Sequence, residues 1–195
     1  MPKIVNHDQR RKSIAVAAAE VIANNGLEST KLTDIGRLAG VTTGAITHYF
    51  NDKDAVLTAA LEVAYDIMFR RMSEVTKQPE YSVFDVLSKA LPTSKKSRQA
   101  MTVWVAFWSR SITEPKVAQQ QIAFHHRWHG LVNEQLVRHF GAHKQPIPDS
   151  IDDISQSLTA QINGLIIRGL VDASDWPTER QHRVLQNYLG TLGVI

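Results

Sequence analysis

The 195-residue chain contains no cysteine. Disulfides, thiolate metal ligands and a cysteine nucleophile are therefore excluded, and a reducing cytoplasm is the expected location. A run of about 18 apolar residues, which a membrane-spanning helix requires, is also missing. The basic N-terminal stretch is not followed by the apolar segment of a signal peptide. Hydrophobic residues make up 43% of the chain, which is typical of a folded globular protein.

The common motifs of enzyme active sites are absent as well. The sequence has no Gly-rich phosphate loop, no Gly-x-Ser-x-Gly elbow and no paired-carboxylate motif. His125 and His129 stand one helical turn apart beside His126, a spacing that suits two metal ligands, but no third ligand is evident. We therefore expect no catalysis, no metal and no cofactor. An all-helical small-molecule enzyme or carrier remains a remote alternative.

Charge gives only a weak indication of a partner. The net charge is +3, but Lys3, Arg10, Arg11 and Lys12 gather within the first twelve residues, against Asp8 alone. A flexible basic arm of this kind is useful near nucleic-acid phosphates. It is as often a solvated tail, so charge by itself does not decide between the two.

Helical periodicity runs through nearly the whole sequence. Strand-like alternation and the Asn-Gly or Asp-Gly signals of β-hairpins are missing, so we predict an all-α fold. Asp8, Thr30, Thr42 and Asp52 are candidate N-caps, and Gly26 and Gly40 are candidate C-terminal stops. The expected helices, about nine in number, cover roughly residues 8–25, 30–39, 42–50, 52–68, 83–91, 99–111, 115–140, 151–171 and 177–189. We place a domain boundary between residues 51 and 52, which gives domains 1–51 and 52–195.

The stretch from Thr33 to Leu57 predicts a very short helix held between two others. Ala39-Gly40-Val41 forms the turn before it, and its outer face carries four small or polar residues: Thr43, Gly44, Thr47 and His48. A short helix with such a face can enter the DNA major groove, which is about 12 Å wide. Thr42 and Thr43 lie at its N-terminus, where free amides attract phosphate, and Lys53 could reach another phosphate. On spacing alone, a plain three-helix packing unit is the alternative.

The residues TKLTDIGRLAGVTTGAITHYFNDKDAVL resemble the N-terminal helix-turn-helix of TetR-family transcriptional regulators, and the match extends over about residues 10–57. It includes the Gly40-Val41 turn and the Thr43-Gly44 start of the recognition helix. The resemblance implies base contacts from Thr43, Gly44, Thr47 and His48. It also implies phosphate contacts from Thr30, Thr42, Tyr49 and Lys53. The length and helical character of the remainder fit the same family, in which a larger second domain binds an inducer and forms a homodimer.

Two segments of the second domain resemble the BetI-like branch of this family, known for choline-responsive repressors of glycine betaine synthesis. They are MTVWVAFWSRSITEPKVAQQQIAFHHRWHGLVNEQL and INGLIIRGLVDASDWPTERQHRVLQNYL. The aromatic residues of the first segment could surround a quaternary ammonium group, at about 0.5–2 kcal/mol for each cation–π contact. Core packing is the alternative for such rings. The predicted ligand-binding residues are Trp104, Phe107, Trp108, Trp128 and Asn163.

One departure from the BetI-like pattern weakens the idea of a cationic ligand. Relatives often carry an acidic residue where this sequence has Asn163, and a neutral amide would not balance a buried cation. The nature of the inducer therefore stays open between a choline-like compound and another small molecule.

The last two long helices carry apolar stripes that predict a dimer interface, although core packing explains part of the pattern. The resemblance implies that these helices pair as a four-helix bundle and place two headpieces in successive major grooves of a palindromic site, about 34 Å apart. The predicted interface residues are Ile154, Leu158, Ile162, Leu165, Ile166, Val184, Leu185 and Tyr188.

The sequence thus predicts a homodimeric repressor that a small-molecule inducer releases from double-stranded DNA. A TetR-like DNA-binding protein that has no inducer, or that activates transcription, is the alternative. The operator, the regulated genes, the inducer and the residues that transmit its signal are not readable from the sequence.

Overall fold

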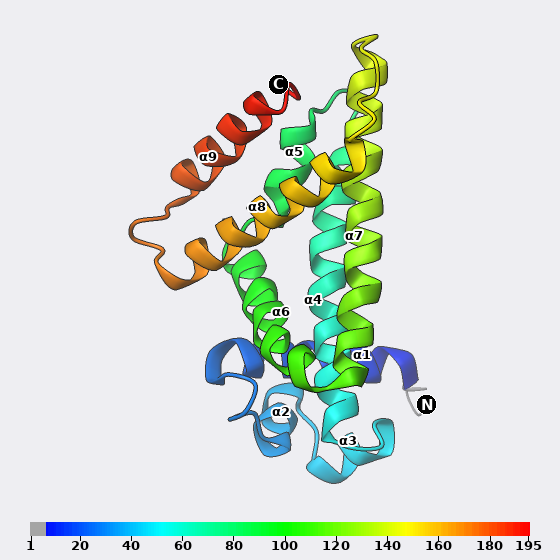
Figure 1. Ribbon diagram of the computed structural model, residues 1–195. Coiled ribbons are helices and arrows are strands. Elements are labelled where there is room, and N and C mark those ends of the chain that lie inside the picture. Colours follow the sequence, from blue (N-terminus) through cyan, green and yellow to red (C-terminus); the bar gives the residue numbers. More distant parts are fainter. Residues whose placement is uncertain (1–6) are drawn as a thin grey trace. The chain divides into compact units, whose positions relative to one another are not determined.

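The computed structural model describes residues 7–195, and in that range the chain forms nine α-helices, one 3₁₀ turn and no strand (Figure 1). The predicted all-α class is therefore confirmed. The part of the predicted basic arm that contains Lys3 lies outside the described residues. The helices are α1 (His7–Asn25), α2 (Leu32–Ala39), α3 (Thr43–Tyr49), α4 (Lys53–Thr76), α5 (Val83–Leu87), α6 (Lys95–Thr113), α7 (Pro115–Ala142), α8 (Ile151–Val171) and α9 (Thr178–Thr191), and the 3₁₀ turn is Ser88–Ala90.

The helices divide into two compact units. The first contains the described residues up to 67 together with 99–109, and the second contains 68–98 and 110–195. This division does not coincide with the predicted boundary between residues 51 and 52, which stays a prediction about the DNA-binding segment. No helix of residues 7–195 is long and apolar enough to cross a membrane.

The three N-terminal helices share a small apolar core. α1 packs against α2 and α3, and Ile14, Ile22, Ile35 and Ile46 are fully buried there. Burial of an isoleucine side chain contributes about 1.5–3 kcal/mol, so these four residues supply much of the force that holds the headpiece together. Figure 1 shows this segment in blue to cyan.

Several predicted helix ends are confirmed. Gly26 and Gly40 adopt positive φ angles of 81° and 66°, which glycine tolerates without steric cost. The Thr42 hydroxyl accepts a hydrogen bond from the amide of Ala45 (3.1 Å), and the Asp52 carboxylate accepts one from the amide of Ala55 (2.7 Å). The chain therefore starts and stops its short helices where the local sequence directs it to.

The predicted N-cap of α2 is wrong. Lys31, not Thr30, is the residue before the helix, and its side chain makes no capping hydrogen bond. Thr30 is fully buried, and its hydroxyl donates to the carbonyl oxygen of Gly26 (2.7 Å). This bond holds the Thr30 side chain on the preceding turn, and no side-chain hydrogen bond caps α2.

A close backbone approach fixes the turn between α2 and α3. The amide of Val41 donates to the carbonyl oxygen of Gly36 (2.9 Å). A Cβ atom at Gly36 would lie only 2.7 Å from the Val41 carbonyl oxygen, a backbone atom that cannot easily move away. A glycine at position 36 is therefore required for the two helices to meet at this angle.

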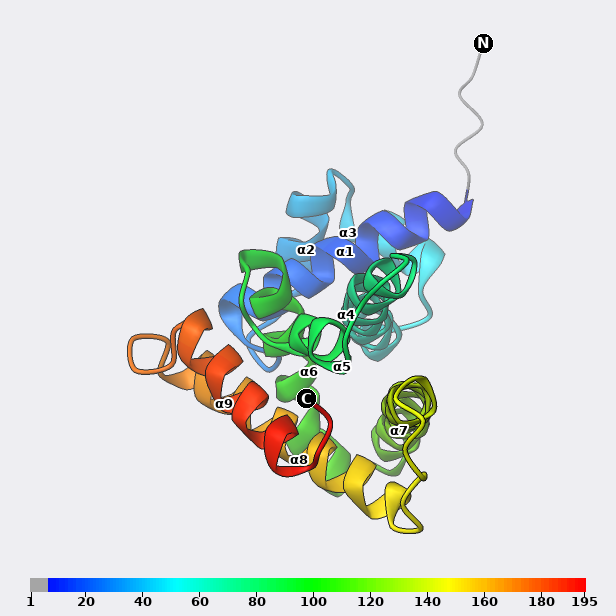
Figure 2. The same ribbon diagram turned by 90° about the horizontal axis from the view of Figure 1, so that it is seen from above.

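In the second unit, α8 packs between α7 and α9, and Figure 2 shows α9 (red) running alongside α8 (orange). This packing corrects the predicted dimer interface. Five of its eight residues are buried inside the single chain and can add almost no area to a contact with a second copy, namely Leu158, Ile162, Leu165, Ile166 and Leu185. Ile154, Val184 and Tyr188 are half-buried and keep some accessible surface. The apolar stripes thus mark the core of the second unit, as the alternative reading allowed.

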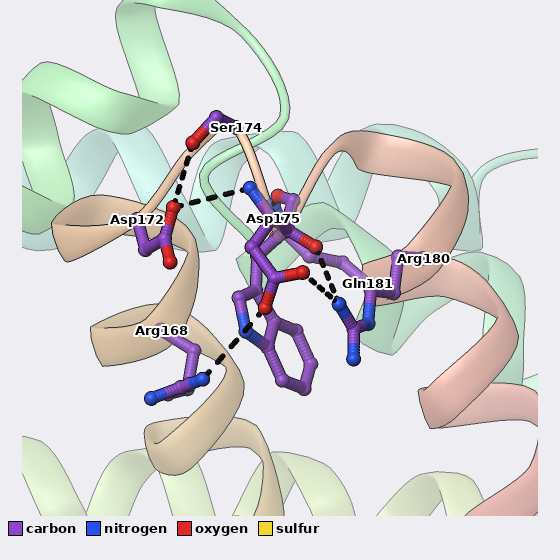
Figure 3. Close-up of polar contacts among 7 residues, drawn as sticks. Arg168, Asp172, Ser174, Asp175, Arg180 and Gln181 are labelled. Atoms are coloured by element: carbon purple, nitrogen blue, oxygen red, sulfur yellow. Dashed lines mark hydrogen bonds and ion pairs between the residues drawn. The ribbon is translucent and has the colours of Figure 1, made fainter.

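Polar contacts fix the connection between α8 and α9 (Figure 3). The Asp172 carboxylate accepts hydrogen bonds from the Ser174 hydroxyl (2.8 Å) and the Asp175 amide (3.1 Å), and the pKa of Asp172 is lowered mainly by the second of these bonds. Asp175 in turn pairs with Arg180 of α9 and lies 3.9 Å from Arg168 of α8. These hydrogen bonds and ion pairs hold the connection in one conformation, which fixes the direction in which α9 leaves it.

The glycine at position 36 generates a stability prediction. Gly36→Ala should destabilise the fold by about 1–3 kcal/mol, because the new methyl group meets a backbone oxygen. Gly130→Ala in α7 is the control, since a Cβ atom there meets nothing within 4 Å and alanine favours helix by up to about 1 kcal/mol. Thermal unfolding followed by circular dichroism measures both changes, and equal melting temperatures for the two variants would contradict this account of the turn.

Candidate nucleic-acid interface and ligand-binding region

The short helix α3 presents a polar face to solvent. Ile46 points into the core, whereas Thr43, Gly44, Thr47 and His48 are all exposed. The Thr47 hydroxyl donates to the carbonyl oxygen of Gly44 (2.9 Å), which leaves its oxygen lone pairs free to accept a bond from a partner. The structure therefore brings the four predicted base-contacting residues together on one surface.

Packing within the chain does not explain why position 44 is a glycine. A Cβ atom at this position would have only the Thr42 hydroxyl oxygen near it, at 3.9 Å, which is ordinary contact distance. Glycine in a helix costs about 0.5–1 kcal/mol relative to alanine. An exposed helical glycine that intramolecular packing does not require suits a site where another molecule approaches the backbone closely.

The predicted phosphate-contacting residues divide into two groups. Thr42, Tyr49 and Lys53 have accessible surface at the two ends of α3 and at the start of α4. Thr30 is fully buried and its hydroxyl is engaged with Gly26, so its side chain cannot reach a phosphate in this conformation. We leave Thr30 out of the candidate interface for that reason.

Two residues of α1 join this surface and were not predicted from the sequence. The imidazole of His7 lies 4.7 Å from the Tyr49 ring, centroid to centroid, and 6.4 Å from the His48 ring. The Arg11 guanidinium donates to the carbonyl oxygen of Tyr49 (2.5 Å). Contacts between residues about forty positions apart leave no periodic signal, and only the excess of basic residues in α1 could have drawn attention to Arg11.

The predicted ligand-binding residues are placed in different parts of the fold. Trp104, Phe107 and Trp108 belong to the first compact unit, and the two tryptophan rings meet edge to face at 4.8 Å. Trp128 and Asn163 belong to the second unit. These five residues as one binding site therefore stay a prediction.

Trp128 is the anchor of a buried polar chain in the second unit. Its indole N–H donates to the Thr159 hydroxyl (3.0 Å), which donates to the carbonyl oxygen of Ser155 one turn earlier (2.9 Å). This chain joins α7 to α8 in the interior. Trp128 thus has a structural role whether or not its ring also contacts a ligand.

Buried polar atoms nearby were not predicted as site residues. The Gln135 side-chain oxygen and the Ser155 hydroxyl are buried, and the described chain offers neither a hydrogen-bond partner. A buried polar group without a partner costs about 1–3 kcal/mol, so water or a ligand is expected to satisfy these atoms. Both residues occupy buried helix positions where an apolar side chain is the usual choice, and that departure was the available sequence signal.

The histidine cluster of α7 does not assemble a metal centre. Among residues 7–195, no group of three or more His, Cys, Asp or Glu side chains is placed to hold a metal ion. His129 lies 3.2 Å from the Asp152 carboxylate of α8. Burial, and then the charge of neighbouring His126, lower the pKa of His125. These contacts are those of histidines that pack between helices.

A short, capped helix with an exposed polar face, packed on two preceding helices, is the arrangement of helix-turn-helix DNA-binding proteins. The family described as bacterial regulatory proteins of the tetR family matches residues 14–60, and the BetI-type transcriptional repressor C-terminal family matches residues 79–194. The chain therefore belongs to the TetR family of transcriptional regulators and has a C-terminal domain of the BetI type. This family is one of regulators and not of enzymes.

Individual relatives agree with this assignment. The regulator BetI of Ectopseudomonas mendocina is 28% identical over 195 residues, which cover 97% of this chain and 96% of the relative. A transcriptional regulator of Rhodococcus sp. Rha1 has the same fold, with a TM-score of 0.81 and 23% identity over 93% of this chain and 94% of the other. A regulator of Saccharomonospora viridis, solved in complex with choline, has a TM-score of 0.81 and 22% identity over 94% and 96% of the two chains. The resemblance stated from the sequence is confirmed.

The Trp128 hydrogen bond can be tested by removing its acceptor. Thr159→Val keeps the shape of the side chain but leaves the indole N–H without a partner, so we expect a loss of about 1–3 kcal/mol in the free energy of unfolding. The same substitution at exposed Thr191 should change stability by less than about 0.5 kcal/mol. Urea unfolding compares the two, and equal effects would show that the buried bond contributes nothing.

Proposed function

We propose that the chain is a homodimeric repressor that binds a palindromic operator through α3 and leaves it when the second unit binds a small molecule. The observation that carries the proposal is the exposed face of α3, where Thr43, Gly44, Thr47 and His48 lie together. Because its proposed partner is chromosomal DNA, we place the protein in the cytoplasm.

The chemistry of this face suits the major groove. Threonine hydroxyls exchange hydrogen bonds with base edges, threonine methyl groups contact the thymine methyl group, and histidine offers a ring N–H. Thr42 and Lys53 flank the face and would hold the phosphates that set the register of the helix. Gly44 would let the backbone approach the DNA, a role that its open surroundings favour.

A homodimer explains how so small a reading surface could select a site. One α3 helix contacts only a few base pairs, and a two-fold symmetric pair reads two half-sites about 34 Å apart. The exposed sides of α8 and α9 are the proposed contact. They include the half-buried Ile154, Val184 and Tyr188, and also Gly164, where a Cβ atom would meet nothing within 4 Å.

The second unit is the proposed inducer-binding domain, and a choline-like compound is the first candidate. Trp128 of this unit supplies a ring face for a quaternary ammonium group, and the choline complex of the Saccharomonospora viridis protein supports this ligand class. Ser155 and Gln135 would add hydrogen bonds to a polar ligand. Asn163 carries no charge to balance a cation, so the ring must provide most of the attraction.

Gly44→Ala should separate DNA binding from protein stability. The methyl group has room in the free protein, so the melting temperature should stay the same or rise slightly. It would stand between the helix backbone and the DNA, so binding to DNA from upstream of the chain's own gene should weaken about tenfold or more. Titration with labelled DNA at fixed salt, with excess nonspecific competitor, measures the effect, and the mass of the complex should correspond to two chains.

Gly130→Ala is the matched control, since Gly130 lies in α7 of the second unit and a Cβ atom there also has open space around it. It should bind DNA as the wild type does. Wild-type-like binding by Gly44→Ala would contradict the proposed reading face, and a complex that contains one chain would contradict the homodimer.

Choline should stabilise the protein if the quaternary ammonium proposal holds. At ten times its dissociation constant a ligand adds about 1.4 kcal/mol, which should raise the melting temperature by roughly 3–5 °C. The control is 3,3-dimethylbutan-1-ol, which has the shape of choline without its charge and should stabilise the protein far less. Unchanged melting at millimolar choline and betaine aldehyde, or equal effects of choline and the alcohol, would refute the cationic inducer.

A further inference from the structure

The recognition helix needs support that its own residues cannot give. α3 has seven residues, and isolated helices shorter than about 12–15 residues are marginal in water. Its N-terminal end is held by the Thr42 cap, and its middle by the buried side chain of Ile46. The orientation of its C-terminal end, where His48 and Tyr49 lie, depends on other contacts.

Arg11 of α1 makes two such contacts at this end. Its guanidinium donates to the carbonyl oxygen of Tyr49 (2.5 Å), one of the last carbonyls of α3, which has no partner inside the helix. The same guanidinium lies over the Phe50 ring, with its carbon 4.2 Å from the ring centroid. A positive charge at a helix C-terminus is favourable, and the planar group meets both the carbonyl and the ring.

His7 lies one helical turn before Arg11, and its side chain contacts the Tyr49 ring. Its imidazole is 4.7 Å from the Tyr49 ring at an interplanar angle of 46°, and the Tyr49 ring is 5.4 Å from the His48 ring. Aromatic pairs in such arrangements contribute about 0.5–1.5 kcal/mol beyond their burial. Two residues of α1 therefore act on the part of α3 that carries the proposed base contact of His48.

We propose that Arg11 and His7 are positioning residues for DNA reading, so that specificity depends on α1 as well as on the helix-turn-helix pair. The inference rests on the proposed function. A site must be held within about 0.5 Å to discriminate between partners, so loosening the end of α3 should affect base reading first. Attraction to phosphates requires only charge near the DNA and should survive.

Arg11→Lys tests the proposal because it keeps the charge and removes the planar fork. The ratio of operator affinity to nonspecific affinity should fall about tenfold, which corresponds to about 1.4 kcal/mol and so to the loss of the hydrogen bond from the guanidinium to Tyr49. Nonspecific affinity and the slope of log affinity against log salt should stay unchanged. Lys12→Gln is the control. Removal of a phosphate contact there would lower both affinities together and reduce the slope by about 0.9.

His7 supplies an independent pair of variants. His7→Phe keeps an aromatic ring against Tyr49 and should keep the affinity ratio, whereas His7→Ala should lower it about threefold to tenfold. A residue with only a structural role would shift the melting temperature without changing the ratio at a temperature where every variant is folded. Circular dichroism at the assay temperature establishes that condition.

The proposal is overturned if Arg11→Lys and His7→Ala both keep the wild-type ratio. It is also overturned if Arg11→Lys keeps the ratio while Arg11→Gln lowers both affinities and the salt slope, because Arg11 would then be a phosphate contact. A wild-type protein without any sequence preference would instead refute the proposed function itself, so the two failures are distinguishable.

Discussion

The recognition helix is too short to hold its own position, and much of the headpiece is explained by that constraint. Seven residues leave one side chain, Ile46, fully buried in the core and four on the exposed face. The helix must therefore be fixed at its ends and through its turn. The Thr42 cap, the close contact of Gly36 with Val41 and the Arg11 hydrogen bond each fix a different part. The small polar surface that we propose to read DNA is possible because neighbouring segments supply the rigidity.

The second unit is also held by specific contacts between segments that are far apart in the sequence. Both terminal nitrogens of Arg98 donate to the carbonyl oxygen of Gly169 (2.8 and 2.7 Å), which joins the start of α6 to the end of α8. A Cβ atom at Gly169 would lie 2.8 Å from the Gln181 side-chain nitrogen and 2.9 Å from Pro92, so α9 is closely packed at the same point. With the polar turn that contains Asp172, these contacts leave α8 and α9 little independent freedom.

Features encoded in adjacent residues were predictable from the sequence, and features that depend on distant contacts were not. The all-α class, the stops at Gly26 and Gly40 and the caps at Thr42 and Asp52 follow from local chemistry. The positions on the exposed face of α3 follow from helical spacing.

Thr30 was misassigned because its hydroxyl has two possible partners, and the sequence does not choose between them. The stripe from Leu158 to Ile166 was assigned to a dimer because apolar periodicity shows that a face is buried, but not which surface buries it. His7 could not be found, and Arg11 was noted only as one residue of the basic arm, because their partners lie about forty residues away.

Selection of binding sites from random double-stranded DNA tests the central claim most directly. The account predicts that the selected sequences share an inverted repeat whose half-site centres are separated by about one helical turn, 34 Å, or a small multiple of it. Such a repeat requires a two-fold symmetric pair of α3 helices that read bases. A selected pool without any shared sequence, or with a single unrepeated motif, would contradict the account of a homodimer that reads DNA through this helix.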